Sequence, residues 1–204
     1  MSKPKLTLAL SHYDRHIPFF DGSVQLKDFD LAVLQVGQSV PLKDGADRHG
    51  RMLRKGEFDA LIMPHPPKEV SGGSDQIKRL FPNPKREELK YFQKNGFYPI
   101  MHILAFKDEI LEKYPEAAMD MMEAFESAKR ICREYYADPN WSLMAWGRHL
   151  FEEERRLLGT DPWPNGFKKN RANLTRFIDY AGDQGLLERA LSPEELFFEP
   201  TLNT

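Results

Sequence analysis

The stretch "KLTLAL" at residues 5–10 decides the fold class of this 204-residue chain. It is a short, leucine-rich run flanked by turn-forming residues, a pattern typical of a β-strand. Residues 29–36 and "FDALIMP" at 58–64 repeat the pattern. Between them a short helix is predicted over 47–55, ending at Gly56. This order of strands and helix predicts the beginning of a mostly parallel sheet, and therefore an α/β fold.

The chain divides into an N-terminal α/β part over residues 1–67, a middle part over 68–110 and a helical part over 111–204. The middle part is predicted to hold a helix over 84–94, with proline in its first turn, and a strand over 98–106. Apolar residues at helical spacing predict three helices in the last part, over 115–136, 140–158 and 170–182. Because 204 residues suffice for one good core, we interpret 1–204 as a single domain.

Composition excludes several classes of protein. The formal charge is -2, and the 29 basic and 31 acidic residues are mixed along the chain, so no basic face for nucleic acid is predicted. The apolar run Leu6–Leu10 is too short for the core of a signal peptide, and no run is long enough to span a membrane. The single cysteine, Cys132, cannot form an internal disulfide. We therefore expect a cytoplasmic protein with no membrane partner.

Polar loops directly follow two of the predicted strands. "SHYDR" at 11–15 follows the first strand, and His65 follows the third. Ligands of open α/β sheets bind at the carboxyl ends of strands, although polar loop residues are more often merely solvated. His12 and His16 have the spacing of a helical metal site, but Pro18 argues against a helix there, so no metal is predicted. Neither a Gly-rich phosphate loop nor a nucleophile motif is found.

His102 lies within "NGFYPIMHILAF" at 95–106, which otherwise has the pattern of a buried strand. A buried imidazole is costly unless both nitrogens find partners, so His102 is either a satisfied core residue or part of a site. In an uninterrupted strand Tyr98 and His102 share one face. A phenol and an imidazole on one face are unusual for a pure core, which favours a site.

Four blocks of the sequence resemble the 4,5-dihydroxyphthalate decarboxylase family, whose members resemble substrate-binding proteins of ABC transporters of the thiamine-precursor type. The most specific pieces are "FYPIMH" at 97–102 and "DPWPNG" at 161–166; from its residues alone, the latter could equally be a rigid connector with Trp163 as a core plug. The matching blocks are "LTLALSHYDR", "RMLRKGEFDALI", "RLFPNPKREELKYFQKNGFYPIMH" and "DPWPNGFKKNRANLTRFIDYAGDQGL".

The resemblance implies a periplasmic-binding-protein-like (type II) lobe with a mixed sheet and a helical C-terminal half. Family members are longer and have a second lobe between the early strands and the "RLFP" segment at 79–82, so here the second lobe is missing or reduced. His65 stands where family members often carry arginine. A lone lobe leaves half a cleft open, which predicts a homo-oligomer.

The activity implied by the resemblance is non-oxidative decarboxylation of a dihydroxylated aromatic dicarboxylic acid, such as 4,5-dihydroxyphthalate to protocatechuate, without a cofactor. His102 and His12 would transfer protons. The residues expected to bind the small aromatic acid are Tyr13, Arg15, His65, Arg79, Tyr98 and Trp163.

Two alternatives remain open. One is a non-catalytic binding protein for an aromatic acid or heterocycle, related to the substrate-binding components of ABC transporters. The other is a relic without function or one half of a hetero-oligomer.

Overall fold

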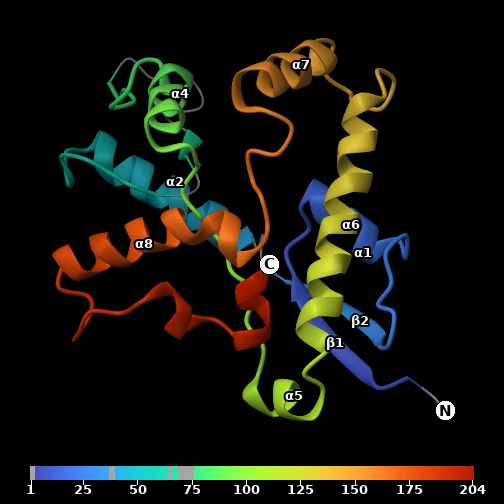
Figure 1. The fold of residues 1–204 in the computed structure, drawn as a ribbon. Helices are drawn as coiled ribbons and strands as arrows, with labels where there is room; N and C mark the ends of the chain where they lie inside the picture. The colour runs from blue at the N-terminus through green and yellow to red at the C-terminus, as the bar shows by residue number, and fades with distance from the viewer. Residues whose placement is uncertain (1–2, 37–39, 64–65, 69–75) are drawn as a thin grey trace.

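The computed structural model describes residues 3–36, 40–63, 66–68 and 76–204. It is a mixed α/β structure, mainly helical, with one small parallel sheet (Figure 1). The elements in chain order are β1 (Lys5–Leu10), η1 (Asp14–His16), α1 (Ile17–Phe20), β2 (Asp30–Gln35), α2 (Val40–Arg54), α4 (Pro84–Asn95), α5 (Asp108–Lys113), α6 (Ala117–Ala137), α7 (Gly147–Leu158), α8 (Phe167–Asp183), η2 (Pro193–Leu196) and η3 (Glu199–Asn203).

The sheet consists of β1 and β2, which run parallel and pair Leu6 with Leu31 and Leu8 with Val33. Burial alternates strictly along β1: Leu6, Leu8 and Leu10 are buried and the residues between them are exposed. This period of two places the leucines on one face, against the core. The predictions for residues 5–10 and 29–36 are confirmed.

Helix α6 covers the leucine face of the sheet (Figure 1). Its buried stripe consists largely of alanines, among them Ala117, Ala124 and Ala128, together with the fully buried Met121. Small side chains let the helix approach the strands closely, so that the leucines fill the space between them. The short helix α1 adds Phe19, whose ring lies 4.8 Å from that of Phe125 between centroids.

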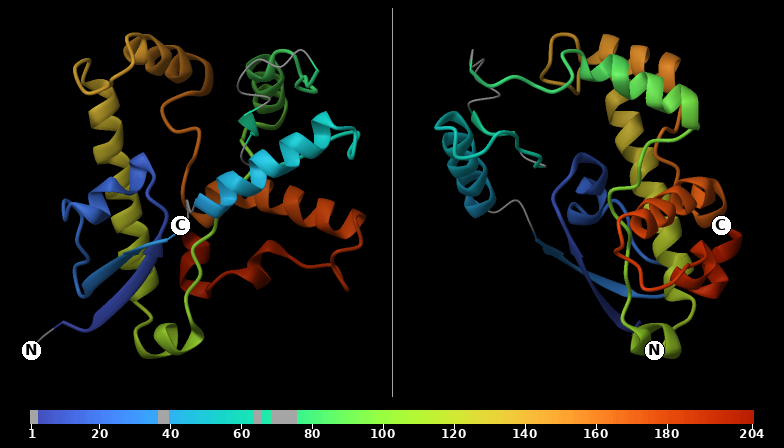
Figure 2. Two further views of the ribbon diagram at one scale, coloured as in Figure 1. Left: turned by 180° about the vertical axis from the view of Figure 1, so that it is seen from behind. Right: turned by 90° about the vertical axis from the view of Figure 1, so that its left-hand side faces the viewer.

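The C-terminal half is built on α8, which contacts η2 and η3. Its buried side chains include Phe167, Leu174 and Ile178. The N-terminus of α8 receives the chain's last residue, since the Phe167 N–H donates to the Thr204 hydroxyl oxygen at 3.0 Å. Helix α4 is joined to α7 by an ion pair of 2.5 Å between Lys85 and Glu153. Figure 2 shows α2 standing apart from α6 at the outside of the molecule.

Two predicted strands are wrong. Residues 58–63 form no regular structure, and Ile62 is 101% exposed. Residues 98–106 are equally without a strand partner, so the described residues form one sheet of two strands rather than four. The physical reason is that an apolar run becomes a strand only when a neighbour supplies hydrogen bonds, and here no neighbouring strand does so. The binding-protein-like lobe stays a prediction.

The helix predictions hold with shifted ends. Helix α4 begins at Pro84 and ends against Gly96, whose φ of 78° is the left-handed conformation that favours glycine. Helix α7 begins at Gly147 rather than 140, because Asp138 accepts the Asn140 N–H and starts a turn. No α-helix spans His12 and His16, as Pro18 suggested; Pro18 instead lies in the first turn of α1, which begins after them at Ile17.

Helix α6 covers Ala117–Ala137 instead of 115–136, and two further helices are extended at the N-terminal end. Helix α2 begins at Val40 instead of 47, and α8 begins at Phe167 instead of 170. Within the described ranges, no helix is long and apolar enough to cross a membrane.

Candidate functional site

A cleft of about 1680 Å³ lies between the sheet–α6 half of the molecule and the α8 half. One wall is built by the carboxyl end of β1, by η1 and by α6. The other wall consists of the extended segment 97–106, the loop 159–166 and the start of α8. The cleft thus opens at the carboxyl end of a parallel strand, where α/β proteins commonly bind ligands.

Tyr13, Arg15 and His102 meet at this cleft. The Arg15 guanidinium carbon lies 4.5 Å from the centroid of the Tyr13 ring, and the Tyr13 and His102 rings lie 6.1 Å apart between centroids. Arg15 is only loosely paired with Asp14, at 3.9 Å, and its side chain is 47% exposed. A cation held by a ring face rather than by a tight carboxylate contact is well suited to receive an anionic ligand.

His16 is a second imidazole in the same wall. Its Nδ1 lies 2.9 Å from the Ser11 carbonyl oxygen, and because a carbonyl only accepts hydrogen bonds, Nδ1 carries the proton. In the neutral ring Nε2 is then an acceptor. Burial lowers the pKa of His16, despite the opposing hydrogen bond to Ser11, and the nearby charge of Arg15 lowers it further. His16 therefore favours the neutral form, which can accept a proton.

Tyr136 fastens η1 to α6. Its hydroxyl donates to an Asp14 carboxylate oxygen at 2.7 Å, and burial together with this bond raises the pKa of Tyr136 to about 12. The phenol therefore stays protonated and keeps donating. Burial also raises the pKa of the neighbouring Cys132 thiol to about 11, so this cysteine is unsuited to act as a nucleophile near neutral pH.

On the opposite wall, the rings of Tyr98 and Trp163 stack at 5.1 Å between centroids with an interplanar angle of 24°. Tyr98 also contacts Phe92 of α4 at 5.3 Å, and Trp163 remains 50% exposed. The buried Asn173 of α8 fixes the backbone here, because its side-chain amide donates to the Tyr98 carbonyl and accepts from the Ile100 N–H.

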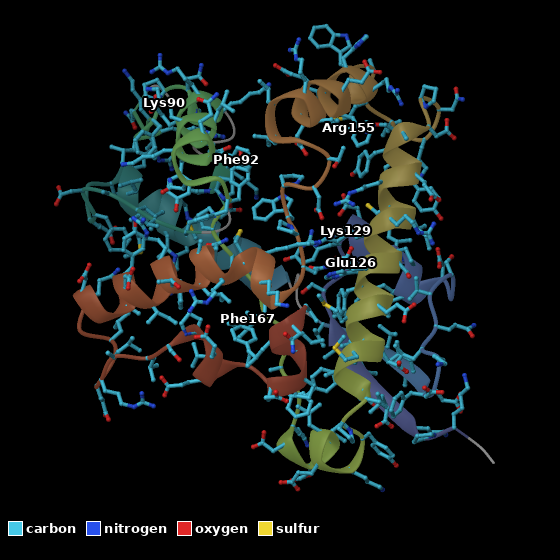
Figure 3. All side chains as sticks on the ribbon, viewed as in Figure 1. Lys90, Phe92, Glu126, Lys129, Arg155 and Phe167 are labelled. Atoms are coloured by element: carbon cyan, nitrogen blue, oxygen red, sulfur yellow. The ribbon has the colours of Figure 1, made fainter. Side chains whose placement is uncertain are left out.

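An ion network joins the two walls. The Lys129 ammonium lies 2.9 Å from Glu126 and 3.1 Å from Asp161, and donates to the Trp163 carbonyl at 3.2 Å. Arg133 forms a second ion pair with Asp161. Partial burial tends to raise the pKa of Glu126, but the hydrogen bond and charge of Lys129 together with the hydrogen bond from Asn165 lower that pKa overall. Figure 3 shows Lys129 and Glu126 on α6 where it faces the loop carrying Trp163.

The cleft brings together five of the eight residues expected from the sequence: Tyr13, Arg15, Tyr98, His102 and Trp163. His12 does not line it; the exposed His12 ring lies against Phe20, at 5.0 Å between centroids. Arg79 is exposed in the segment before α4 and does not line it either. His65 lies outside the described residues.

Two expectations need correction. His102 is exposed on an extended segment instead of lying in a buried strand, so it is no core histidine. "DPWPNG" is more than a connector with a core plug, because Trp163 is half exposed and lines the cleft. As for metals, the part of the chain that the structure describes holds no cluster of three or more suitable histidine, cysteine or carboxylate side chains.

Several residues of the cleft escaped the sequence reasoning: His16 as an acid–base group, Lys129, Asp161 and Asn173. The sequence suggests His16 only as a metal ligand, although its position next to "SHYDR" is a signal for a role at the same site. Lys129 and Asp161 are 32 residues apart, and a pairing across that distance leaves no local pattern to read.

We expect His16 to make stability depend on pH. The pKa of His16 is lower in the folded than in the unfolded chain. As the pH falls, the unfolded chain is therefore protonated at a higher pH than the folded chain. Stability is then lost as the pH falls from the unfolded pKa, about 6.5, toward the lower folded value. Denaturant melts between pH 7.5 and 5 should show a smaller pH slope in His16→Gln than in the parent chain. Equal slopes would rule out this contribution.

No family model matches the chain. A curated relative does: 4,5-dihydroxyphthalate decarboxylase from Comamonas testosteroni is 29% identical over 155 residues, which is 75% of this chain and 47% of that enzyme. The chain therefore spans about half the length of the relative it matches. The match supports the family relationship suspected from the sequence blocks, and makes this chain a distant homologue of a 4,5-dihydroxyphthalate decarboxylase.

Proposed function

We propose that this chain decarboxylates a dihydroxylated aromatic dicarboxylic acid such as 4,5-dihydroxyphthalate, without an electron-transfer step. The observation that carries the proposal is the meeting of Tyr13, Arg15 and His102 at one cleft that also holds the Tyr98–Trp163 stack. An imidazole, a loosely paired guanidinium and aromatic faces are the groups that this chemistry requires. The similarity to a decarboxylase points the same way.

In the proposed reaction, a phenolic oxygen para to the departing carboxylate pushes electrons into the ring. The ring carbon bearing that carboxylate takes up a proton, the carbon–carboxyl bond breaks, and carbon dioxide leaves with the ring restored. His102 is the proposed proton donor, because histidine titrates near neutral pH and this ring borders the cleft beside Tyr13. Arg15 binds a carboxylate of the substrate through its planar fork of donors.

His16 completes the proton transfers. Its Nε2 is free to accept while Nδ1 is committed to the Ser11 carbonyl, so it is the proposed acceptor for the phenolic proton. The two imidazoles then have opposite roles, His102 giving a proton and His16 taking one. Their mutual repulsion as cations contributes to lowering the pKa of His16, which suits a base.

The direct test is incubation of the protein with 4,5-dihydroxyphthalate while carbon dioxide and protocatechuate are quantified. Formation of both in equal amounts supports the proposal. Saturable binding without either product would favour the non-catalytic binding protein instead. The cleft of about 1680 Å³ is larger than the roughly 300–1,000 Å³ of common small-molecule sites. Its size is therefore compatible with the binding function as well.

Arg15→Ala should weaken binding of the aromatic dicarboxylate. Loss of one charge-assisted hydrogen bond costs about 1.5 to 3 kcal/mol, which corresponds to roughly a 10- to 150-fold rise in Kd. Calorimetric titration measures the change. Arg79→Ala is the matched control, because Arg79 is exposed and lies away from the cleft, and its Kd should stay within twofold of the parent value. Equal effects of both variants would mean that only net charge matters.

A further inference from the structure

The chain exposes far more surface than a compact monomer of its size. Its accessible surface is 14966 Å², whereas a compact 23.7 kDa protein exposes about 9,800 Å². The difference, roughly 5,000 Å² per chain, exceeds what one partner contributes to a large permanent interface. Large apolar side chains form part of this surface, among them Met101 and Ile103, which are 72% and 69% exposed.

Segment 100–106 belongs to no helix or strand and is apolar apart from His102. Phe106 packs against the core and Leu104 is 42% exposed, while Met101 and Ile103 are the most exposed apolar residues of the segment. Residues 101–105 are all exposed, so the segment presents apolar side chains to solvent along the wall of the cleft. No charged residue interrupts positions 100–106.

The backbone of this segment has no partner of its own. Ile100 is held by the Asn173 side chain, but among the described residues no hydrogen bond reaches the backbone groups of 101–106. An exposed apolar stretch with unpaired N–H and C=O groups is a template for adding another strand. Figure 2 shows the chain here running from α4 past α8 to α5 at the outside of the molecule.

We propose that two copies of this chain form a dimer in which segment 100–106 of each copy pairs antiparallel with the same segment of the other. A twofold axis at Ile103 would place Met101 of one copy opposite Ala105 of the other. Such self-pairing needs no second surface, because an isologous interface is complementary to itself. The ladder ends naturally at Pro99, which has no N–H to donate. The uncharged sequence makes a second copy the favoured occupant, since like charges would oppose self-pairing.

The dimer would also close the candidate site. His102 lies in the pairing segment and Leu104 lines the cleft, so a second copy docked on this segment shields the cleft from water. This consequence rests on the proposed function. The pairing itself does not, because it follows from exposed area, apolar composition and unpaired backbone alone.

Sedimentation equilibrium of the full chain from 0.1 to 50 μM tests the proposal, together with hydrogen exchange of the backbone amides. We expect a reversible dimer in which alternate amides of 101–106, those that point at the partner strand, are protected at high concentration and exchange rapidly on dilution. Ile103→Asp should raise the dissociation constant by at least about a hundredfold, since two buried isoleucines are replaced in each dimer.

Ile62→Asp is the matched control, because Ile62 is 101% exposed and lies outside the segment; its dimer should keep the parent dissociation constant. A monomer at all concentrations overturns the proposal, and so does a dimer whose 101–106 amides stay unprotected. These outcomes are independent of turnover, so failure of the decarboxylase proposal would leave them unchanged.

Discussion

Replacement of His102 by asparagine is expected to lower turnover of the aromatic dicarboxylate by at least about two orders of magnitude, because a positioned general acid contributes about a hundred- to ten-thousand-fold in rate. Asparagine keeps the approximate shape and a hydrogen-bonding amide but cannot give up a proton near neutral pH. Binding should therefore be largely retained. The measurement is kcat from product formation, with Kd from titration of the same preparation.

His149→Asn provides the matched control for this variant. His149 is exposed on α7 and does not line the cleft, so its turnover should equal that of the parent chain. The oligomeric state of His102→Asn should be measured as well, because the residue lies in the proposed pairing segment. Intact turnover in a His102→Asn variant with a lowered Tm would assign the residue a structural role and remove it from the reaction.

Lys129→Met should destabilise the fold by about 2 to 4 kcal/mol. The Lys129 side chain is 13% exposed and contacts both Glu126 and Asp161. Methionine fills a similar volume but leaves Glu126 without its cation and Asp161 with Arg133 alone. A partly buried charge that loses its partner is costly. Chemical denaturation gives the change in the free energy of unfolding.

The control is Lys90→Met on α4. Lys90 also pairs with a glutamate three residues away, Glu87, but its side chain is 61% exposed. Surface pairs of this kind contribute between zero and about 1 kcal/mol. If Lys129→Met and Lys90→Met lower the free energy of unfolding by similar amounts, the ion network across the cleft stabilises the fold no more than an ordinary surface pair does.

The sequence predicts correctly those helices and strands whose causes lie within a few neighbouring residues. Leucines at every second position specify β1, and alanines at helical spacing specify α6. Proline at the start and glycine at the end fix α4. These signals act over a few residues and can be read from the sequence.

The strand predicted over 98–106 failed for a non-local reason. Its composition suits a strand, but a strand also needs a neighbour, and the sequence does not say whether one is present. The same limit applies to the site. Tyr13, Arg15 and His102 were found because they lie in distinctive blocks, whereas Lys129 became visible only once α6 and the loop at 159–166 were seen together.

The separation between the sheet and the helix that covers it has a consequence for synthesis of the chain. The leucine face of β1 is complete by residue 10, but its cover, α6, begins only at Ala117. A ribosome adding about 5–20 residues per second needs roughly 5 to 20 seconds to pass from β2 to the end of α6. During that interval α6 does not yet cover the leucine face of the nascent sheet, and the exposed leucines can bind chaperones or neighbouring chains. Docking of a helix from so far along the chain also implies slow folding, because distant contacts are entropically expensive to close.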